Sequence, residues 1–409
     1  MEFVADFHIH SKYSRATSSE MNVEALSSWA KIKGIKLLGT GDWTHPLWLA
    51  ELKEKLTPTG EGLFEYNGTL FILTVEVYNL FYRNGKAKSI HNIIFAPDFK
   101  TADEINKALK GAGDLRIDGR PILKMDPSSL VKTILGINNR CLIVPAHVWT
   151  PHFSLFGSNS GFDSIEECFE DQTQNIHCLE TGLSSDPGMN WRWSALDRFS
   201  LISNSDSHSP RKIGREANVF NAELNYDEII TALKEKDRKK FLYTVEFFPE
   251  EGKYHYDGHR LCKVRLSPSE TRKNKGLCPG CGKKVTVGVV NRVEKLCDRD
   301  EGFKPESAVP FKNAIPLEEI IADAFGVSTG TVTVEREYKA IIQRLGNEFD
   351  ILFKVDEKEL LESANPKVAK GILKVRKGEV HVLPGYDGEY GKVHIFEQEE
   401  KKGKQLTFF

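Results

Sequence analysis

The sequence lacks a long hydrophobic run and has few histidines and cysteines. No apolar segment approaches the roughly 20 residues that a membrane-spanning helix needs, and the first ten residues are already charged and strand-like rather than a leader peptide. There are seven cysteines, an odd number, which favours reduced thiols and metal ligation over a disulfide framework. We therefore expect a cytoplasmic protein with no membrane segment.

A glycine-rich phosphate-binding sequence is also missing after the first predicted strand, which disfavours the alternative of an open, doubly wound sheet. Instead, about seven short apolar runs alternate with helical segments through residues 1–245, and this alternation predicts parallel strands in an α/β barrel. The predicted strands are residues 2–5, 35–38, 70–77, 90–96, 141–146, 176–179 and 199–202.

Beyond residue 245 the composition changes. Residues 246–303 are rich in Gly, Lys and Arg and predict a small zinc-binding domain, whereas residues 304–395 predict a mainly helical domain. Residues 396–409 predict a flexible tail. Several domains agree with the length of 409 residues, because one hydrophobic core rarely serves so long a chain.

Histidines and carboxylates recur beside the predicted strands. His8 and His10 lie one residue apart after the first strand, and Asp206 and His208 repeat this spacing after the seventh. A strand points alternate side chains to the same face, so each pair projects two metal-binding groups in one direction. An isolated histidine is equally well explained by a core hydrogen bond, but the recurrence favours a metal centre. The expected ligands are His8, His10, Asp42, Glu76, His91, His147, Asp206 and His208.

This ligand set predicts two or three divalent ions, Mg, Mn or Zn, with Glu76 bridging two of them. Two closely spaced ions can activate water and stabilise both the entering and the leaving oxygen of a phosphoester. We expect Asp206 to accept a proton from the attacking water, and His208 or Arg192 to hold the phosphate. Any third ion would depend on Asp42 and His208.

A second metal site is predicted in the Gly-rich region. His259 and Cys262 form one close pair and Cys278 and Cys281 another, with fifteen residues between the pairs, which is typical of one structural zinc ion. Cys297 competes with His259 for the fourth position. Because Cys297 lies in a segment with helical apolar spacing, burial as a small apolar side chain also explains it.

Positive charge is concentrated around the predicted zinc domain. Residues 234–300 contain 17 Lys and Arg against 10 Asp and Glu, although the whole chain has a net charge of only -2. A basic block beside a metal centre indicates a polyanionic partner, whereas a solvated surface is the plainer alternative. Helices predicted at residues 317–325, 333–345 and 357–364 would either clamp nucleic acid or pack as an ordinary bundle.

The strand-end histidines and carboxylates resemble those of the polymerase and histidinol phosphatase (PHP) superfamily of metal-dependent phosphoesterases over about the first 245 residues. This resemblance implies a distorted (β/α)7 barrel. A wider set of motifs is similar to the endonuclease Q family of DNA repair nucleases across nearly the whole chain. These motifs are GTGDWTHPLW, FGSNSGFDSIEECFED, LETGLSSDP, YHYDGH and CPGCGKK, followed by the helical region.

The second resemblance implies cleavage of the phosphodiester bond on the 5′ side of a deaminated base, such as hypoxanthine, uracil or xanthine, or of an abasic site. The damaged nucleotide is then expected to leave the base stack, because a stacked base cannot be inspected. Residues expected to bind this DNA are Trp149, Phe153, Phe156, Glu180, Trp191 and Arg192.

The terminal sequence KQLTFF resembles a truncated clamp-binding peptide of archaeal replication and repair proteins. It implies a sliding-clamp contact through Gln405, Phe408 and Phe409, although a tail that folds onto its own protein explains the aromatic pair as well. We expect a monomer. Two other functions stay open, a small-molecule phosphatase of the histidinol phosphate type and a non-catalytic DNA-binding repair adaptor.

Overall fold

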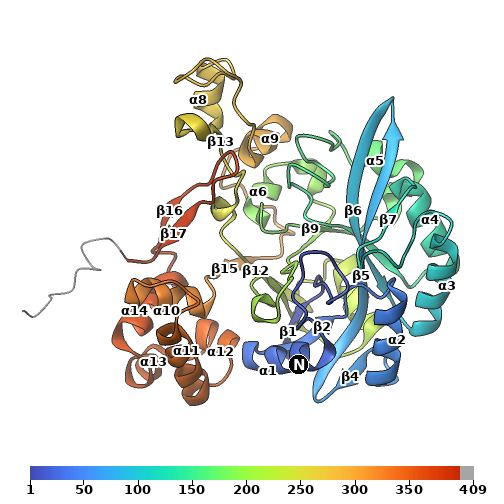
Figure 1. The fold of residues 1–409 in the computed structure, drawn as a ribbon, viewed down its shortest axis with the longest axis horizontal. Helices are drawn as coiled ribbons and strands as arrows, with labels where there is room; N and C mark the ends of the chain where they lie inside the picture. Colours follow the sequence, from blue (N-terminus) through green and yellow to red (C-terminus); the bar gives the residue numbers. More distant parts are fainter. Residues whose placement is uncertain (397–409) are drawn as a thin grey trace, which may run out of the picture.

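The structure is a computed structural model that describes residues 1–396 and divides visibly into three parts (Figure 1). The largest part contains the main sheet and its helices. The predicted zinc domain projects at the top of the view, and the last helices form a separate group at the left, with a small hairpin between these two parts. Among residues 1–396, no helix combines the length and the apolar character that crossing a membrane requires.

The main sheet contains eleven strands, in the order β15-β12-β11-β1-β2-β5-β4-β3, with β6 and β7 also paired to β5 and β8 paired to β6. Its strands are β1 (Glu2–Asp6), β2 (Ile35–Gly39), β3 (Thr57–Pro58), β4 (Phe64–Tyr66), β5 (Thr69–Arg83), β6 (Lys86–Ala96), β7 (Ile122–Leu123), β8 (Leu142–Pro145), β11 (Ala217–Asn221), β12 (Phe241–Glu246) and β15 (Phe311–Asn313).

Five of these strands and a separate parallel pair, β9 (Cys178–Glu180) and β10 (Ser200–Ile202), form a distorted barrel. Beyond β8, the Val148 amide donates to the Glu180 carbonyl (3.0 Å), which joins β8 to β9. A parallel bridge between Ile9 and Ser207 then joins the segment after β10 to the extension of β1. The ring is therefore β1, β2, β5, β6, β8, β9 and β10, and the predicted seven-strand α/β barrel is confirmed.

The expectation that all these strands are parallel is wrong. β5 and β6 form an antiparallel hairpin, and β6 also runs antiparallel to β8. The reason is the two-residue turn Asn84-Gly85, whose φ angles of 53° and 72° are those of the tight turn that Asn-Gly favours. As a result, Glu76 and His91 lie within long strands rather than at strand ends.

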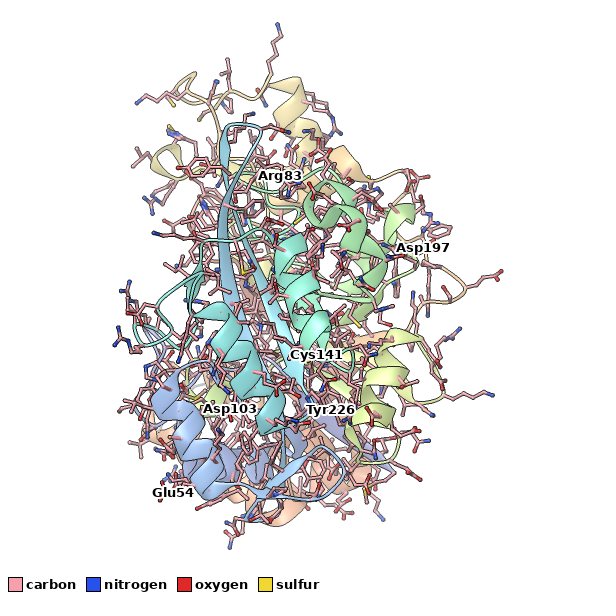
Figure 2. All side chains as sticks on the ribbon, turned by 90° about the vertical axis from the view of Figure 1, so that its right-hand side faces the viewer. Glu54, Arg83, Asp103, Cys141, Asp197 and Tyr226 are labelled. Carbon is pink, nitrogen blue, oxygen red and sulfur yellow. The ribbon has the colours of Figure 1, made fainter. Side chains whose placement is uncertain are left out.

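Helices cover the outside of the barrel. Figure 2 shows α3 and α4 side by side in front of the long β5–β6 hairpin. The first helix begins at Asn22, whose side chain accepts the Ala25 amide, and ends at Gly34 in the left-handed conformation. The helices are α1 (Val23–Lys33), α2 (Pro46–Lys55), α3 (Phe99–Leu109), α4 (Pro127–Ile137), α5 (Glu166–Phe169), α6 (Pro187–Trp191) and α7 (Tyr226–Lys234), with 3₁₀ turns η1 (Glu170–Asn175), η2 (Ser194–Leu196) and η3 (Pro210–Lys212).

The zinc-binding region has little apolar core of its own. Its buried cluster consists of Leu266, Cys278 and Val285, far too few residues to hold a fold without a further constraint. Its elements are η4 (Pro249–Glu251), β13 (Asp257–His259), η5 (Arg260–Cys262), β14 (Val264–Leu266), α8 (Pro268–Lys273) and α9 (Val289–Leu296).

The C-terminal region is helical, as predicted, with a small hairpin at its end. Its helices pack through their own apolar core. Its elements are α10 (Leu317–Phe325), α11 (Val332–Leu345), α12 (Glu348–Phe353), α13 (Glu357–Ser363), α14 (Pro366–Arg376), β16 (His381–Leu383) and β17 (Lys392–His394).

The C-terminal region contacts the barrel through a strand pairing, a buried ion pair and surface ion pairs such as Arg211–Glu318 (3.1 Å) and Lys354–Glu2 (3.1 Å). β15 pairs with β12, so residues 311–313 belong to the main sheet although the sequence suggested a domain boundary before them. The buried Lys33 ammonium of α1 contacts the Glu348 carboxylate of α12 (2.8 Å), which also accepts the Tyr338 hydroxyl (2.5 Å). Removing one partner would leave a buried charge unpaired, which is costly.

Candidate metal centre

The first two predicted ligands lie just beyond β1, at the closing bridge of the barrel. The His10 amide donates to the Ser207 carbonyl (3.0 Å), so the segment that carries His8 and His10 lies against the segment that carries Asp206. Asp42 follows β2. Asp42, His147 and Asp206 all have positive φ angles (49°, 33° and 46°), a strained conformation for such residues that is concentrated at functional sites.

Glu76 is the centre of the arrangement. Its carboxylate is buried and lies close to four histidines, two that follow β1, one in β6 and one that follows β8. Oε1 is 2.6 Å from His91 Nδ1 and 2.9 Å from His147 Nε2, whereas Oε2 is 3.3 Å from His10 Nε2 and 3.6 Å from His8 Nε2. Asp206 completes the site, with its Oδ1 3.1 Å from His10 Nε2.

These residues form two groups of donor atoms that share Glu76. Within each group every pair of donor atoms lies within 4.8 Å. The first group is His8, His10, Glu76 and Asp206, and the second is Glu76, His91 and His147. The structure thus brings together six of the eight predicted ligands.

Second partners fix the orientation of the histidine rings. His8 Nδ1 donates to the buried Glu180 carboxylate (3.0 Å), and His10 Nδ1 donates to Asp42 (3.0 Å). In the neutral rings the Nε2 atoms therefore carry the lone pairs, and they face Glu76 and Asp206. Such carboxylate partners select the histidine tautomer in metal sites and raise the ligand's basicity.

The chemistry of the donors fits divalent cations. His8 Nε2 is buried and has no hydrogen-bond partner among residues 1–396, although it lies 3.6 Å from both Glu76 Oε2 and Asp206 Oδ1. Burial alone would lower the pKa of His8 and of His10, but the surrounding carboxylates outweigh burial and raise both pKa values. Burial alone would raise the pKa of Glu76, but the four surrounding histidines, His91 and His8 most strongly, keep it well below its usual range. A mixed imidazole and carboxylate set of this kind suits Zn, Mn or Fe.

Two predicted ligands lie outside both donor groups. Asp42 is fully buried and accepts from His10 Nδ1, from the Ser11 amide (2.6 Å) and from the Ser11 hydroxyl (2.7 Å). In this position it orients the His10 ring. His208 Nδ1 donates to the Asp206 carbonyl (2.9 Å), which leaves its partly exposed Nε2 free to accept a proton or a hydrogen bond. The structure does not assemble the expected third site from these two residues.

Arg120 is a site residue that the sequence did not reveal. Its guanidinium donates to Glu76 Oε2 (3.2 Å), and its side chain is 25% exposed. Backbone bonds hold the loop on both sides of it, from the Gly119 amide to the Tyr13 carbonyl (3.1 Å) and from the Tyr78 amide to the Pro121 carbonyl (3.0 Å). The loop has no periodic pattern that could have pointed to this position.

Several predicted DNA-binding residues are engaged elsewhere. Glu180 is fully buried, where its carboxylate accepts hydrogen bonds from His8 Nδ1 (3.0 Å) and from the His147 amide (2.8 Å). Trp149 and Phe156 are 1% and 0% exposed and pack against each other, so they offer no face to a base. Trp149 and Phe156 are buried because the loop after β8 packs them into the apolar core, whereas Glu180 ends β9 and is paired with His8.

The other three candidates differ in their surroundings. Phe153 is 44% exposed and stacks on the His91 ring, with centroids 5.4 Å apart and planes at 11°. Trp191 is partly buried against Phe311. Arg192 donates to the sulfur of Cys297 (3.6 Å), at the side of α9, and not to the metal centre. Of the six predicted DNA-binding residues, Phe153 is the one that presents an exposed ring beside the metal centre.

The second predicted metal site is also assembled. One donor atom from each of His259, Cys262, Cys278 and Cys281 lies within 4.8 Å of the others, a set that suits a tetrahedral zinc ion. Cys297 is not part of this group, because it follows α9 and its thiol donates to the Glu294 carbonyl (3.5 Å). The predicted clamp-binding residues Gln405, Phe408 and Phe409 lie outside the described residues.

The chain is similar in fold to a nuclease of known structure. It superposes on the lesion-specific endonuclease PfuEndoQ of Pyrococcus furiosus with a TM-score of 0.88 and 30% identity, covering 99% of this chain and 98% of the other. The chain belongs to the endonuclease Q family. A second endonuclease Q structure, bound to a 27-mer duplex with an abasic lesion at its active site, superposes with a TM-score of 0.86 and 30% identity over 99% of each chain.

Two sequence relatives of this endonuclease Q homologue are named as uncharacterised proteins. YqxK of Bacillus subtilis (strain 168) is 30% identical over 369 residues, which are 88% of this chain and 89% of that protein. MJ0043 of Methanocaldococcus jannaschii is 33% identical over 279 residues, which are 66% of this chain but only 33% of that protein. The family model described as the MJ0043 C-terminal domain matches residues 316–379, which contain α10 to α14.

Proposed function

We propose that the protein is a DNA repair endonuclease that hydrolyses the phosphodiester bond on the 5′ side of deaminated bases, such as hypoxanthine, uracil and xanthine, and of abasic sites. The observation that carries the proposal is the shared carboxylate of Glu76, which belongs to two adjacent donor groups. This arrangement lies in a fold that matches a lesion-specific endonuclease along nearly its whole length.

Each donor group is assigned one divalent ion. His8, His10, Glu76 and Asp206 would hold one, and Glu76, His91 and His147 the other, with Mg, Mn and Zn as candidates. Ions bound there would lower the pKa of water and neutralise charge on the phosphate. Glu180 and Asp42 keep two of the rings in the ligating tautomer through His8 Nδ1 and His10 Nδ1.

The protein's own side chains provide the remaining chemistry. Asp206 is placed to accept a proton from the attacking water, because its carboxylate is 31% exposed while its neighbours in the first donor group are buried. His208 Nε2 is free to contact the phosphate or the leaving oxygen. Arg120 replaces Arg192 as the cation that steadies the phosphate, since its planar guanidinium lies at the centre itself and matches phosphate geometry.

Phe153 is proposed to contact the extruded nucleotide. Its exposed ring lies against His91, so a base stacked on it would lie beside the second donor group. Aromatic stacking accepts any base, and lesion preference would then follow from the lower cost of extruding a mispaired or missing base.

The decisive experiment incubates the purified chain and Mg²⁺ or Mn²⁺ with end-labelled duplexes containing deoxyinosine, deoxyuridine or an abasic site, beside an undamaged duplex and a phosphomonoester. We expect a single nick on the 5′ side of each lesion. The Asp206→Asn variant should bind the duplex but not cut it. Release of phosphate from the monoester alone would select the small-molecule phosphatase, and binding without any nick would select the repair adaptor.

The sliding-clamp contact and the monomeric state are proposals as well. Neither follows from the donor geometry. Size-exclusion chromatography of the full chain, with and without an archaeal sliding clamp, and of a chain ending at residue 395 tests both.

A further inference from the structure

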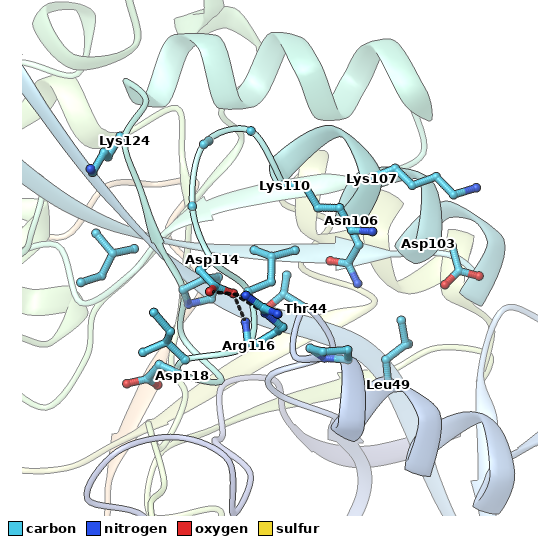
Figure 3. A pocket seen from close by; sticks show the side chains of 18 of the residues that line it. Thr44, Leu49, Asp103, Asn106, Lys107, Lys110, Asp114, Arg116, Asp118 and Lys124 are labelled. Atoms are coloured by element: carbon cyan, nitrogen blue, oxygen red, sulfur yellow. Dashed lines mark hydrogen bonds and ion pairs between the residues drawn. The ribbon is translucent and has the colours of Figure 1, made fainter.

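A large hollow lies beside the metal centre, between α2, α3 and the loop of residues 110–124 (Figure 3). Its volume is about 1290 Å³. The same loop forms its wall and reaches the metal centre, because Asp118 lines the hollow while Arg120, two residues later, donates to Glu76. Gly119 between them packs directly on Asp42, where an added Cβ would lie 2.3 Å from the carboxyl carbon. The hollow is therefore directly adjacent to the metal centre.

The three acidic residues that line the hollow are already paired with cations that line it too. Lys53 contacts Asp103 (2.7 Å), Arg116 contacts Asp114 (2.9 Å) and Arg15 contacts Asp118 (3.6 Å). Figure 3 shows the Arg116–Asp114 pair on the loop. These pairs cancel in charge.

Three further lysines line the hollow, and among residues 1–396 no carboxylate lies within 4.0 Å of their ammonium groups. They are Lys107, Lys110 and Lys124, all exposed. Lys124 lies on one side of the hollow and the other two on the opposite side (Figure 3). The hollow therefore has a surplus of three positive charges, carried by lysines on two sides of it.

Apart from Thr44, Asn106 and two glycines, the rest of the lining is apolar, with exposed Ile117 (64%) and Ile122 (48%), and none of the described residues that line it is aromatic. The unpaired lysines suit phosphates, and the lining offers no ring on which a base could stack. This composition argues against a pocket for the extruded base and for sequence-independent contact with a nucleic-acid backbone.

We propose that this hollow binds the sugar–phosphate backbone of the DNA strand that flanks the cleaved bond, with Lys107, Lys110 and Lys124 as the phosphate contacts. The inference rests on the proposed function and adds a path for the strand. Three phosphates bound in the hollow would hold the duplex in register, so that the scissile phosphate stays at Arg120 and Glu76.

The test compares the Lys107→Ala/Lys110→Ala/Lys124→Ala variant with the unmodified lysines, both in the full chain carrying Asp206→Asn, which keeps the duplex intact. Binding to a deoxyinosine duplex is measured from low to physiological salt. Each lost phosphate contact should reduce the slope of log Kd against log salt by about 0.9, so the triple variant should lose roughly 2 to 3. The Lys100→Ala/Lys132→Ala variant, which removes exposed lysines from α3 and α4 outside the hollow, should keep the slope.

Uncharged methylphosphonate linkages, placed singly along the damaged strand, locate the contacts. Some positions flanking the cleavage site should weaken binding by the lysine-bearing chain and no longer weaken binding by the triple variant. An unchanged salt slope, or equal losses in the Lys100/Lys132 variant, would overturn the inference, and an acidic protein partner would then be the better occupant. Failure of the unmodified chain to nick any lesion is a separate result that overturns the proposed function instead.

Discussion

Replacing Arg120 is the sharpest test of the proposed active site. The guanidinium is three-quarters buried, lies 3.2 Å from Glu76 and is held by a loop that is hydrogen-bonded on both sides. A charged hydrogen bond to phosphate contributes about 1.5–3 kcal/mol, and loss of one preorganised donor in an active site lowers the rate by about 10²–10³. We therefore expect Arg120→Ala to cleave about a hundredfold more slowly than the unmodified chain. Arg120→Lys keeps the charge but loses the planar fork, and should lose about tenfold.

The assay is single-turnover cleavage of a deoxyinosine duplex with enzyme in excess, together with the metal content of each variant. Added guanidinium should partly restore cleavage by Arg120→Ala, because the cation can occupy the space that the side chain leaves. A role in holding the fold would not respond to it. The matched control is Arg140→Ala, which removes an exposed arginine paired with Asp227 (2.8 Å) on the outside of the barrel. Full activity of Arg120→Ala, or a loss explained by missing metal, would refute the reasoning.

Three further predictions test other parts of the structure. Phe153→Ala should reduce the ratio of kcat/KM for deoxyinosine over undamaged duplexes by about tenfold, because stacking contributes about 1–3 kcal/mol per base, and an unchanged ratio would remove Phe153 from lesion recognition. Cys278→Ser should lose one zinc per chain and make residues 257–288 sensitive to limited proteolysis, whereas Cys297→Ser should keep the zinc and stay resistant to the protease. Loss of zinc from Cys297→Ser would instead identify Cys297 as a zinc ligand. Burial raises the pKa of Glu246 from 4.5 to about 8. Between these pH values the unfolded chain releases the Glu246 proton while the folded chain keeps it, so the free energy of unfolding falls as pH rises. The contribution of Glu246 to stability is therefore complete below pH 4.5 and is lost as pH rises to 8. Glu246→Gln should therefore match the unmodified chain near pH 4.5 and exceed its free energy of unfolding by roughly 2–4 kcal/mol near pH 8 in chemical denaturation, and a difference that does not change with pH would contradict this origin.

Much of the fold could be predicted because its signals are local. The strand after Gly34 and the helix of residues 317–325 follow from apolar periodicity and from glycine stops, which act within a few residues. The zinc group likewise follows from short spacings between its two pairs. The small strands β11 and β15 were missed because asparagine and lysine interrupt their short apolar runs, ANVFN and FKN.

The candidate site was only partly predictable, since its finer roles depend on distant contacts. Asp42 and Glu180 are acidic residues that follow or end short strands, as a ligand would, yet each is paired with the Nδ1 atom of a histidine from another part of the chain. Arg120 lies in an irregular loop, where sequence patterns give no direction to a side chain. Trp149 and Phe156 look like surface aromatics in a loop, but the loop packs them inward. Such assignments need the tertiary structure.

The Asn84-Gly85 turn shows how a local signal can decide a distant site. It fixes the register of β5 and β6 so that Tyr78 faces His91 and Glu76 faces Ile93. Residues two apart share a face of a strand, so Glu76 and His91 point to the same side and their side chains meet at 2.6 Å. A shift of one residue in the pairing of β5 with β6 would turn His91 to the opposite face, and its donor atom would no longer lie beside those of Glu76 and His147. The pairing of two metal-binding side chains thus depends on a turn that lies six or more positions from either of them, in a part of the hairpin that touches no ligand.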